Sequence, residues 1–317
     1  MTQAFLFSGQ GSQSVGMMRA LGERYDVVRA TFDQASQVLG DDLWHLVDQG
    51  PEEQLNQTVW TQPAMLAAGV ATYRVWREQG GDVPTAMAGH SLGEYSALVC
   101  ADALSFTDAT ALVARRAQLM QDAVAPGAGA MVAVIGLSDE QVSESCTKAA
   151  QGEVVEAVNF NAPGQVVVAG DASAVARLID QANADGAKRV IPLPVSVPSH
   201  CALMRPAGDA YEEALAKVAV STPTVRILFN AGPVDPADPN SMRAAMARQI
   251  YSPVPWRSTI ETLLAEGTER FYECSPGRVL SGLVKRIHRR AKMISLHDAD
   301  AMDAALAATE LENGEQQ

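Results

Sequence analysis

The sequence predicts an α/β fold in which a parallel sheet covered by helices is interrupted by a smaller subdomain. Two observations lead to this prediction. Up to about residue 124, short apolar segments alternate with longer amphipathic ones, which is typical of a parallel sheet with helices on its faces. The stretch Pro126-Gly127-Ala128-Gly129 then ends this pattern, and shorter elements follow in the order β-α-β-β-α-β.

The first 124 residues supply the beginning of the parallel sheet. Apolar runs at residues 4–7 and 84–88 predict strands, and residues 94–100 and 108–124 predict helices. After the subdomain we expect the larger domain to resume with a helix near residues 208–218, a strand near residues 225–229 and then further helices.

The subdomain is predicted from four short strands and two helices. The strands are expected at residues 130–135, 154–158, 165–169 and 189–193, and the helices at residues 139–150 and 172–184. This order is the ferredoxin-like plan. We therefore predict a catalytic domain formed by residues 1–124 and 196–317, with a ferredoxin-like subdomain, residues 125–195, inserted into it.

Composition excludes several classes of function. The net charge of −13 argues against nucleic acid as a partner, because phosphate binding needs a basic face. No apolar run is long enough to span a membrane, and no charged segment followed by an apolar one opens the chain. The cysteines are scattered and form no metal-binding spacing: Cys100, Cys146, Cys201 and Cys274. We expect a cytoplasmic protein with reduced thiols and no bound metal.

A candidate nucleophile lies in Gly89-His90-Ser91-Leu92-Gly93, between a predicted strand and a predicted helix. This context fits the sharp turn of a G-x-S-x-G elbow, which is typical of hydrolase-like parallel sheets. The elbow would expose the Ser91 hydroxyl, and the amide of Leu92 at the helix start could donate to an oxyanion. The alternative is a serine that only caps the helix.

A serine nucleophile needs a base, and His200 is the best candidate among the five histidines. It follows the last strand of the subdomain in a loop, where catalytic residues are common. His90 lies within the elbow itself, and His45 and His288 lie on predicted helices. No acidic residue stands out as the third member of a triad.

Arg116 falls at the centre of the apolar face of the helix predicted over residues 108–124, whereas Arg115 points about 100° away toward solvent. A guanidinium that faces inward stays charged, so it needs an anion. The sequence alone leaves open an internal salt bridge and a bidentate grip on a substrate carboxylate.

The loop Gly9-Gln10-Gly11 after the first strand is typical of a backbone that approaches a negative charge. A nucleotide-binding protein would need a full G-x-G-x-x-G or a G-x-x-x-x-G-K-[ST] at this point, and neither pattern is present. A lipase-like or esterase-like hydrolase would share the elbow, but it would not need an inward-facing arginine.

From residue 5 to about residue 287 the chain closely resembles the malonyl-CoA:acyl carrier protein transacylases, which are related to the acyltransferase domains of polyketide synthases. The resemblance is carried by several long motifs in order: GQGSQ at 9–13, TQPA at 61–64, GHSLGEYSAL at 89–98, VNFNAPGQVVVAG at 158–170, LPVSVPSH at 193–200, RQIYSPVPW at 248–256 and SPGRVLSGLVKRI at 275–287.

The resemblance implies a role for each matching residue. Ser91 would carry the malonyl group, His200 would act as base, and Arg116 would hold the free carboxylate of the malonyl group. Gln10 and Leu92 would form the oxyanion hole with their main-chain amides. The main-chain carbonyl of Gln249 would orient the histidine in place of a carboxylate. Three further residues match polar positions near the substrate: Gln62, Asn159 and Asn161.

The implied reaction is ping-pong transfer of malonyl from malonyl-CoA to the pantetheine thiol of acyl carrier protein, with no cofactor. A trans-acting acyltransferase of a polyketide pathway would share every motif, and methylmalonyl stays open beside malonyl. Carrier proteins are acidic, so we expect docking at a basic stretch that includes Lys285, Arg286, Arg289 and Arg290. The alternative for this stretch is a solvated helix face.

Overall fold

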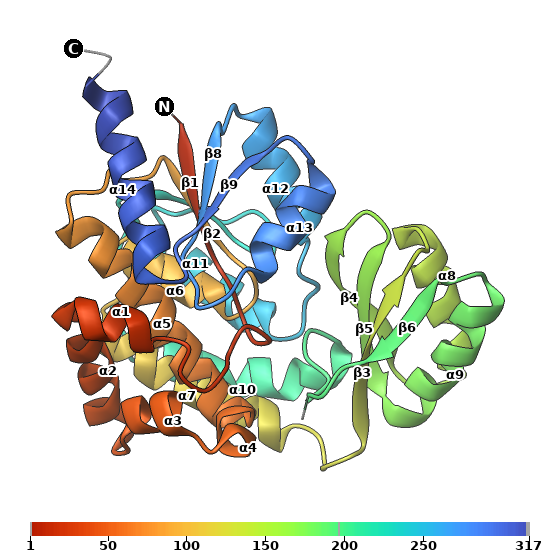
Figure 1. The fold of residues 1–317 in the computed structure, drawn as a ribbon. Coiled ribbons are helices and arrows are strands. Elements are labelled where there is room, and N and C mark those ends of the chain that lie inside the picture. Colours follow the sequence, from red (N-terminus) through yellow and green to blue (C-terminus); the bar gives the residue numbers. More distant parts are fainter. Residues whose placement is uncertain (1, 196, 315–317) are drawn as a thin grey trace. The chain divides into compact units, whose positions relative to one another are not determined.

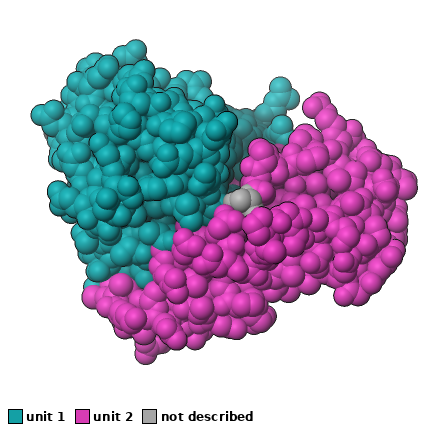
Figure 2. All heavy atoms as spheres, turned by 90° about the horizontal axis from the view of Figure 1, so that it is seen from below, with its two compact units in different colours: residues 1–114, 221–228, 262–317 teal, residues 115–220, 229–261 magenta. Residues whose placement is uncertain are grey.

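The computed structural model describes residues 2–195 and 197–314, with side chains up to Thr309. The chain divides into two compact units. The first unit contains residues 1–114, 221–228 and 262–317, and the second contains residues 115–220 and 229–261 (Figure 2). Helices α7 (Phe106–Asp122) and α12 (Trp256–Ala265) each carry the chain from one unit into the other.

A five-stranded parallel sheet forms the centre of the first unit (Figure 1). Its order is β7-β2-β1-β8-β9, and the strands span Gln3–Phe7 (β1), Ala86–Gly89 (β2), Arg226–Leu228 (β7), Arg270–Glu273 (β8) and Lys292–Ser295 (β9). Phe7 at the end of β1 lies opposite Gly89 at the end of β2, and Leu6 lies opposite Glu273. The loops that follow β1, β2 and β8 therefore leave the same edge of the sheet, where ligands bind in such folds.

Aromatic side chains hold the sheet of the first unit to its longest helix, α5. Phe5 stacks on Tyr272 with ring centroids 4.9 Å apart, and Trp76 of α5 lies 4.8 Å from Tyr272. Tyr73, one turn earlier on α5, meets Phe5 edge-on at 5.6 Å. The helices that belong wholly to this unit are α1 (Arg19–Arg24), α2 (Asp26–Leu39), α3 (Leu43–Gln49), α4 (Glu52–Leu55), α5 (Thr58–Glu78), α6 (Gly93–Cys100), α13 (Val279–Ile287) and α14 (Ala299–Gly314).

The second unit contains a four-stranded antiparallel sheet with the order β4-β5-β3-β6. Its strands span Gly129–Ile135 (β3), Val155–Ala162 (β4), Gln165–Asp171 (β5) and Arg189–Pro192 (β6), and its helices are α8 (Asp139–Ala150) and α9 (Ala172–Ala184). Apolar residues of both helices pack on Val132, Val134, Val166 and Val168. The ferredoxin-like arrangement is confirmed, because each helix connects two parallel strands that have another strand between them.

The opposite face of this antiparallel sheet is also covered. Met131, Ala133 and Val167 pack against Cys201, which follows the candidate base in sequence. The chain continues into a short 3₁₀ helix (Ala202–Met204), α10 (Arg205–Leu215) and, after β7, α11 (Pro239–Gln249). The segment that carries His200 is thus anchored on the sheet of the same unit.

The predicted fold class, a hydrolase-like parallel-sheet core with a ferredoxin-like subdomain, is confirmed. The sequence predicted further helices after residue 229 but not the strands β8 and β9, which complete one side of the parallel sheet. The division into residues 1–124 plus 196–317 and residues 125–195 stays a prediction. Residues 1, 196 and 315–317 of that predicted catalytic domain lie outside the described residues.

Glu273 at the end of β8 caps the first turn of α13. Its buried carboxylate accepts hydrogen bonds from the main-chain nitrogens of Leu280 and Ser281, at 2.9 and 2.7 Å, and from the hydroxyls of Ser281 and Ser275, at 2.6 and 3.2 Å. These bonds satisfy amides that a helix start leaves without intrahelical partners. Burial has the larger effect and raises the pKa of Glu273, while the hydrogen bonds oppose it.

We expect Glu273→Gln to lower the free energy of unfolding by about 1–3 kcal/mol near pH 5, because the amide has one acceptor oxygen for these donors. The folded state binds the Glu273 proton more tightly than the unfolded state, since its pKa is raised above 4.5. The carboxyl therefore favours folding most below that pH, and its contribution falls as the pH rises. Urea unfolding from about pH 4.5 to about pH 7 should show the difference between wild type and variant shrinking. If the difference in unfolding free energy between wild type and Glu273→Gln grew with pH, the raised pKa of Glu273 would be contradicted. Glu269→Gln, at an exposed site, is the control.

Candidate active site

Ser91 lies on the turn between β2 and α6, with a backbone φ of 51°. This left-handed conformation is unusual for a residue other than glycine and marks a sharp change of chain direction. Both flanking residues must be glycines, because a side chain would not fit at either position. A Cβ atom on Gly89 would lie 1.9 Å from the carbonyl carbon of Gly93, and one on Gly93 would lie 2.0 Å from the carbonyl oxygen of Phe7. The strand-to-helix elbow expected from the sequence is therefore present.

The loop after β1 lies directly against this turn. A Cβ atom on Gly9 would be 2.7 Å from the carbonyl oxygen of His90 and 3.6 Å from the nitrogen of Leu92. Leu92 is 1% exposed and precedes the first residue of α6, so its amide belongs to the helix N-terminus. Gln10 directly follows Gly9. The backbones of Gln10 and Leu92, the two residues expected to form the oxyanion hole, therefore lie near each other.

The side chain of Gln10 is held by α5. Its amide nitrogen donates to the Thr58 hydroxyl at 3.4 Å, and its amide oxygen accepts from Gln62 at the same distance. Gln62 is fully buried. The side chain of Gln62, the polar position expected near the substrate, therefore also helps to fix the loop after β1.

His200 is 2% exposed and is fixed by two main-chain carbonyls at the carboxyl end of α11. Its Nδ1 lies 2.8 Å from the carbonyl oxygen of Gln249, and its backbone nitrogen donates to the carbonyl oxygen of Ile250 at 3.1 Å. A carbonyl oxygen only accepts, so the hydrogen is on Nδ1. In the neutral imidazole this leaves a lone pair on Nε2, which can take a proton. His200 also has a positive φ, 68°.

Arg116 on α7 is 1% exposed, whereas Arg115 is exposed, as the helical periodicity predicted. The Nη2 atom of Arg116 donates to the side-chain oxygen of Gln249 at 3.0 Å. Gln249 thus contacts the base through its main chain and the arginine through its side chain. All three residues belong to the second unit.

The segment after Gln249 is fixed at two further points. The ring of Tyr251 occupies the space over Gly208 of α10, where a Cβ atom would lie 2.4 Å from the ring. Val254 exchanges main-chain hydrogen bonds with β4, donating to Val158 at 2.8 Å and accepting from Phe160 at 3.0 Å. The carbonyls that orient His200 are therefore attached to both α10 and the antiparallel sheet.

Asn159 and Asn161 lie on β4 and are 6% and 8% exposed. The pairing of β4 with β5 shifts register between Ala157 and Asn159 and again between Phe160 and Ala162. Such bulges bend a strand and redirect its side chains, and they are frequent beside active sites. The sequence pattern predicted this strand only as far as residue 158, so the bulged part that carries both asparagines was not predicted.

The basic stretch runs from Arg278, directly before α13, to Lys292 at the start of β9 in the first unit. Its cationic residues are all exposed: Arg278, Lys285, Arg286, Arg289, Arg290 and Lys292. Arg278 lies 2.8 Å from His297 Nε2, and Lys285 donates to the carbonyl of Ala291. Their role as a carrier-binding surface stays a prediction.

The cysteines of this chain are free thiols. Cys201 directly follows His200, but burial raises its pKa to about 12, so its thiol stays protonated at neutral pH. Within residues 2–195 and 197–314, no group of three or more His, Cys, Asp or Glu residues could hold a metal ion. In the same part of the chain, no helix has the length and apolarity needed to cross a membrane.

Three further residues that position the site were not singled out from the sequence: Thr58, Ile250 and Tyr251. The signal was available in part, because RQIYSPVPW was recognised as a motif, but which atoms of a motif make contacts depends on the folded backbone.

A serine on a strand-to-helix elbow of a parallel sheet places this protein in the class of α/β proteins with a nucleophile elbow. The sequence pattern described as "Acyl transferase domain" matches residues 4–312. The malonyl CoA-acyl carrier protein transacylase of Escherichia coli K12 is 52% identical over 307 residues, covering 96% of this chain and 99% of the relative. The transacylase of Bacillus subtilis is 40% identical, with 98% of each chain covered.

Two solved structures agree with these relatives. An acyl carrier protein S-malonyltransferase from Vibrio cholerae has a TM-score of 0.93 and 51% identity, covering 96% of this chain and all of that one. A malonyl-transacylase in complex with a type II PKS acyl-carrier protein has a TM-score of 0.95 and 48% identity, covering 97% of this chain and all of that one. The chain belongs to the acyl transferase family and is an acyltransferase.

Proposed function

We propose that this chain transfers the malonyl group of malonyl-CoA to the pantetheine thiol of acyl carrier protein through a malonyl-Ser91 intermediate. The arrangement around Gln249 carries this proposal, because one residue contacts both the base and a buried cation. An esterase acting on uncharged acyl groups has no use for that cation. The E. coli and B. subtilis relatives, both named malonyl CoA-acyl carrier protein transacylases, support the same reaction.

In the first half-reaction, the Ser91 hydroxyl attacks the thioester carbonyl, and its proton passes to Nε2 of His200. The negative charge on the carbonyl oxygen is stabilised by the amides of Gln10 and Leu92. The carbon–sulfur bond then breaks, and the CoA sulfur leaves as the thiol with the proton from His200. The free carboxylate of the malonyl group forms an ion pair with Arg116 throughout.

In the second half-reaction, the carrier thiol gives its proton to His200 and attacks the malonyl ester. The carbon–oxygen bond to Ser91 breaks, and Ser91 recovers the proton. The Gln249 carbonyl keeps the hydrogen on Nδ1 in both halves, so Nε2 alternates between base and acid. Asn159 and Asn161 are proposed to contact the substrate near this site, and Gln62 to act beside them through the loop of Gln10.

We further propose that the reaction needs no cofactor or metal and takes place in the cytoplasm. Each chemical step uses groups that the chain and its two substrates supply. The free thiols of Cys100, Cys146, Cys201 and Cys274 fit a reducing compartment.

The proposed function predicts ping-pong kinetics. Double-reciprocal plots against malonyl-CoA at several carrier concentrations should be parallel. Without a carrier, the enzyme should release about one equivalent of CoA and then stop. Intersecting lines, or continued CoA release together with free malonate, would contradict malonyl transfer and favour a hydrolase.

A second candidate is a trans-acting acyltransferase of a polyketide pathway. It is favoured by one observation, the 48% identical malonyl-transacylase in complex with a type II PKS acyl-carrier protein. The chemistry would be the same and only the carrier would differ. Comparing kcat/KM for a fatty acid carrier and a polyketide carrier separates the two.

The exposed cations between Arg278 and Lys292, on and beside α13, are proposed to attract the acidic carrier protein to this acidic enzyme. We expect Arg286→Glu with Arg290→Glu to slow transfer to the carrier about tenfold at low salt, with little difference at high salt. Lys148→Glu with Lys217→Glu, at exposed sites in the second unit, changes the net charge equally and is the control. Unchanged rate and salt dependence in the Arg286/Arg290 variant would rule out docking at this surface.

A further inference from the structure

Gln249 is fully buried at the carboxyl end of α11, and its two functional groups contact different residues. Its main-chain oxygen accepts from Nδ1 of His200 at 2.8 Å. Its side-chain oxygen accepts from Nη2 of Arg116 at 3.0 Å. The main chain alone explains how the base is oriented, so the side chain has a separate purpose.

The partner that Gln249 offers to Arg116 is neutral. An amide oxygen fixes the direction of one N–H group of the guanidinium and leaves the positive charge in place. A carboxylate at the same position would form a charge-assisted pair with the guanidinium and neutralise it. At a site that is 1% exposed, this neutralisation would be strong, because little water screens the charges.

We infer that Gln249 is a specificity-determining positioning residue, whose neutral side chain orients Arg116 without neutralising the charge that binds a carboxylate on the acyl group. This inference rests on the proposed function, in which Arg116 binds the malonyl carboxylate. Position 249 thereby selects for charged acyl groups, although its side chain does not react.

The geometry allows the side chain of residue 249 to be changed while the base keeps its partners. His200 is held by main-chain oxygens of residues 249 and 250, which every substitution retains. The segment after them is fixed by Tyr251 over Gly208 and by the main-chain bonds of Val254. None of these contacts uses the Gln249 side chain.

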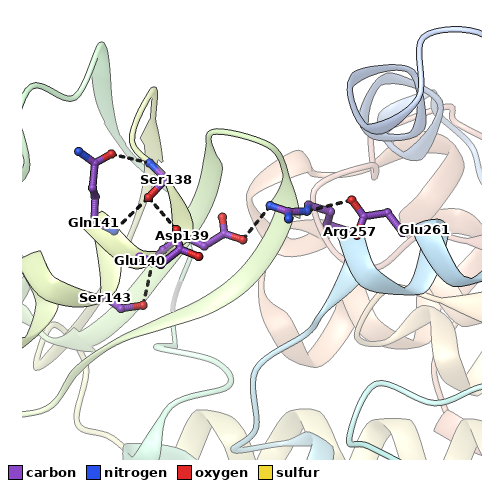
Figure 3. Close-up of polar contacts among 7 residues, drawn as sticks. All are labelled: Ser138, Asp139, Glu140, Gln141, Ser143, Arg257 and Glu261. Atoms are coloured by element: carbon purple, nitrogen blue, oxygen red, sulfur yellow. Dashed lines mark hydrogen bonds and ion pairs between the residues drawn. The ribbon is translucent and has the colours of Figure 1, made fainter.

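Arg257 adds a further attachment of the same segment (Figure 3). Its Nη1 lies 3.0 Å from a carboxylate oxygen of Asp139, the first residue of α8, and its Nε lies 3.1 Å from Glu261. Figure 3 also shows the capping box of α8, in which Ser138 and Gln141 exchange hydrogen bonds. The ion pair to Asp139 therefore joins the segment to a well-defined helix start of the same unit.

The test compares Gln249→Glu with Gln249→Met, a variant of similar length without an acceptor oxygen or a charge. Rates of acyl-enzyme formation are measured by intact-protein mass spectrometry with malonyl-CoA and with acetyl-CoA. We expect Gln249→Glu to lower the malonyl-to-acetyl ratio of rates by at least about 100-fold, because the glutamate neutralises Arg116. We expect Gln249→Met to lower the malonyl rate about tenfold and the acetyl rate less than about threefold, because the guanidinium loses orientation and keeps its charge.

Each outcome decides the inference. If Gln249→Glu lowers the malonyl and acetyl rates equally, the inference is overturned. If that variant does not fold, equal losses of the two rates in Gln249→Met overturn it instead. The pH profile of acetylation should match the wild type in Gln249→Met, since the carbonyl partner of His200 remains; a displaced profile would mean that the side chain acts through the base. If the wild-type protein gains no malonyl group, both the proposed function and this inference are overturned. If the wild type is malonylated but the malonyl-to-acetyl ratio of rates is the same in the Gln249 variants as in the wild type, the inference alone is overturned.

Discussion

Replacing Ser91 by alanine is expected to lower malonyl transfer by at least about 10⁴-fold, because the variant has no atom that can carry the acyl group between the two substrates. Ping-pong transfer depends on this covalent step, so the loss should appear in both half-reactions. Initial rates of CoA release and of carrier malonylation measure it. Ser91 is only partly buried and its hydroxyl is small, so the variant should unfold at nearly the wild-type temperature.

The same variant separates catalysis from helix capping. If Ser91 only capped α6, alanine would lower the stability by about 1 kcal/mol and leave transfer largely intact. Ser138→Ala is the matched control, because Ser138 caps α8 in the second unit through its hydroxyl. It should show the loss of stability with unchanged transfer. A Ser91→Ala variant that still transfers malonyl would contradict the assignment of the nucleophile.

Replacing Arg116 by alanine is expected to lower kcat/KM for malonyl-CoA about 10³-fold, because a carboxylate would enter a buried site without its cation. Acetyl-CoA has no carboxylate, so its kcat/KM should fall far less and the preference between the two substrates should narrow or reverse. Competition between both thioesters, read as the masses of the two acyl-enzymes, gives the ratio directly.

Arg115→Ala is the matched control for this effect. Arg115 is the neighbouring residue of α7, has the same charge and is exposed, so its loss should change neither rate by more than about twofold. Equal losses of malonyl and acetyl transfer in Arg116→Ala would mean that the arginine stabilises the fold around Gln249 and does not bind substrate.

The elements that follow from local pattern were predictable from the sequence. Alternating apolar segments and the two crossover helices gave the ferredoxin-like order, and Gly89 and Gly93 around Ser91 gave the elbow. In contrast, β8 was missed. Its ends are two charged residues, Arg270 and Glu273, yet both are buried, and Glu273 accepts hydrogen bonds from α13 and Ser275.

Contacts between distant segments were beyond the sequence pattern itself. The hydrogen bond from His200 to the carbonyl of Gln249 was expected only through the resemblance to a family, because any main-chain oxygen could serve. The bond from Arg116 to the Gln249 side chain was not expected, since it joins residues 133 positions apart in sequence. The bulges around Asn159 and Asn161 depend on strand pairing and have no local signature.

The central claim is that Ser91 carries a malonyl group on its way from CoA to a carrier protein. The most direct measurement is incubation with isotopically labelled malonyl-CoA, digestion and mapping of the labelled peptide, before and after addition of carrier protein. We expect label on the peptide that contains Ser91, transfer of that label to the carrier, and no label in Ser91→Ala. Label on another residue, or free malonate without any labelled peptide, would contradict it.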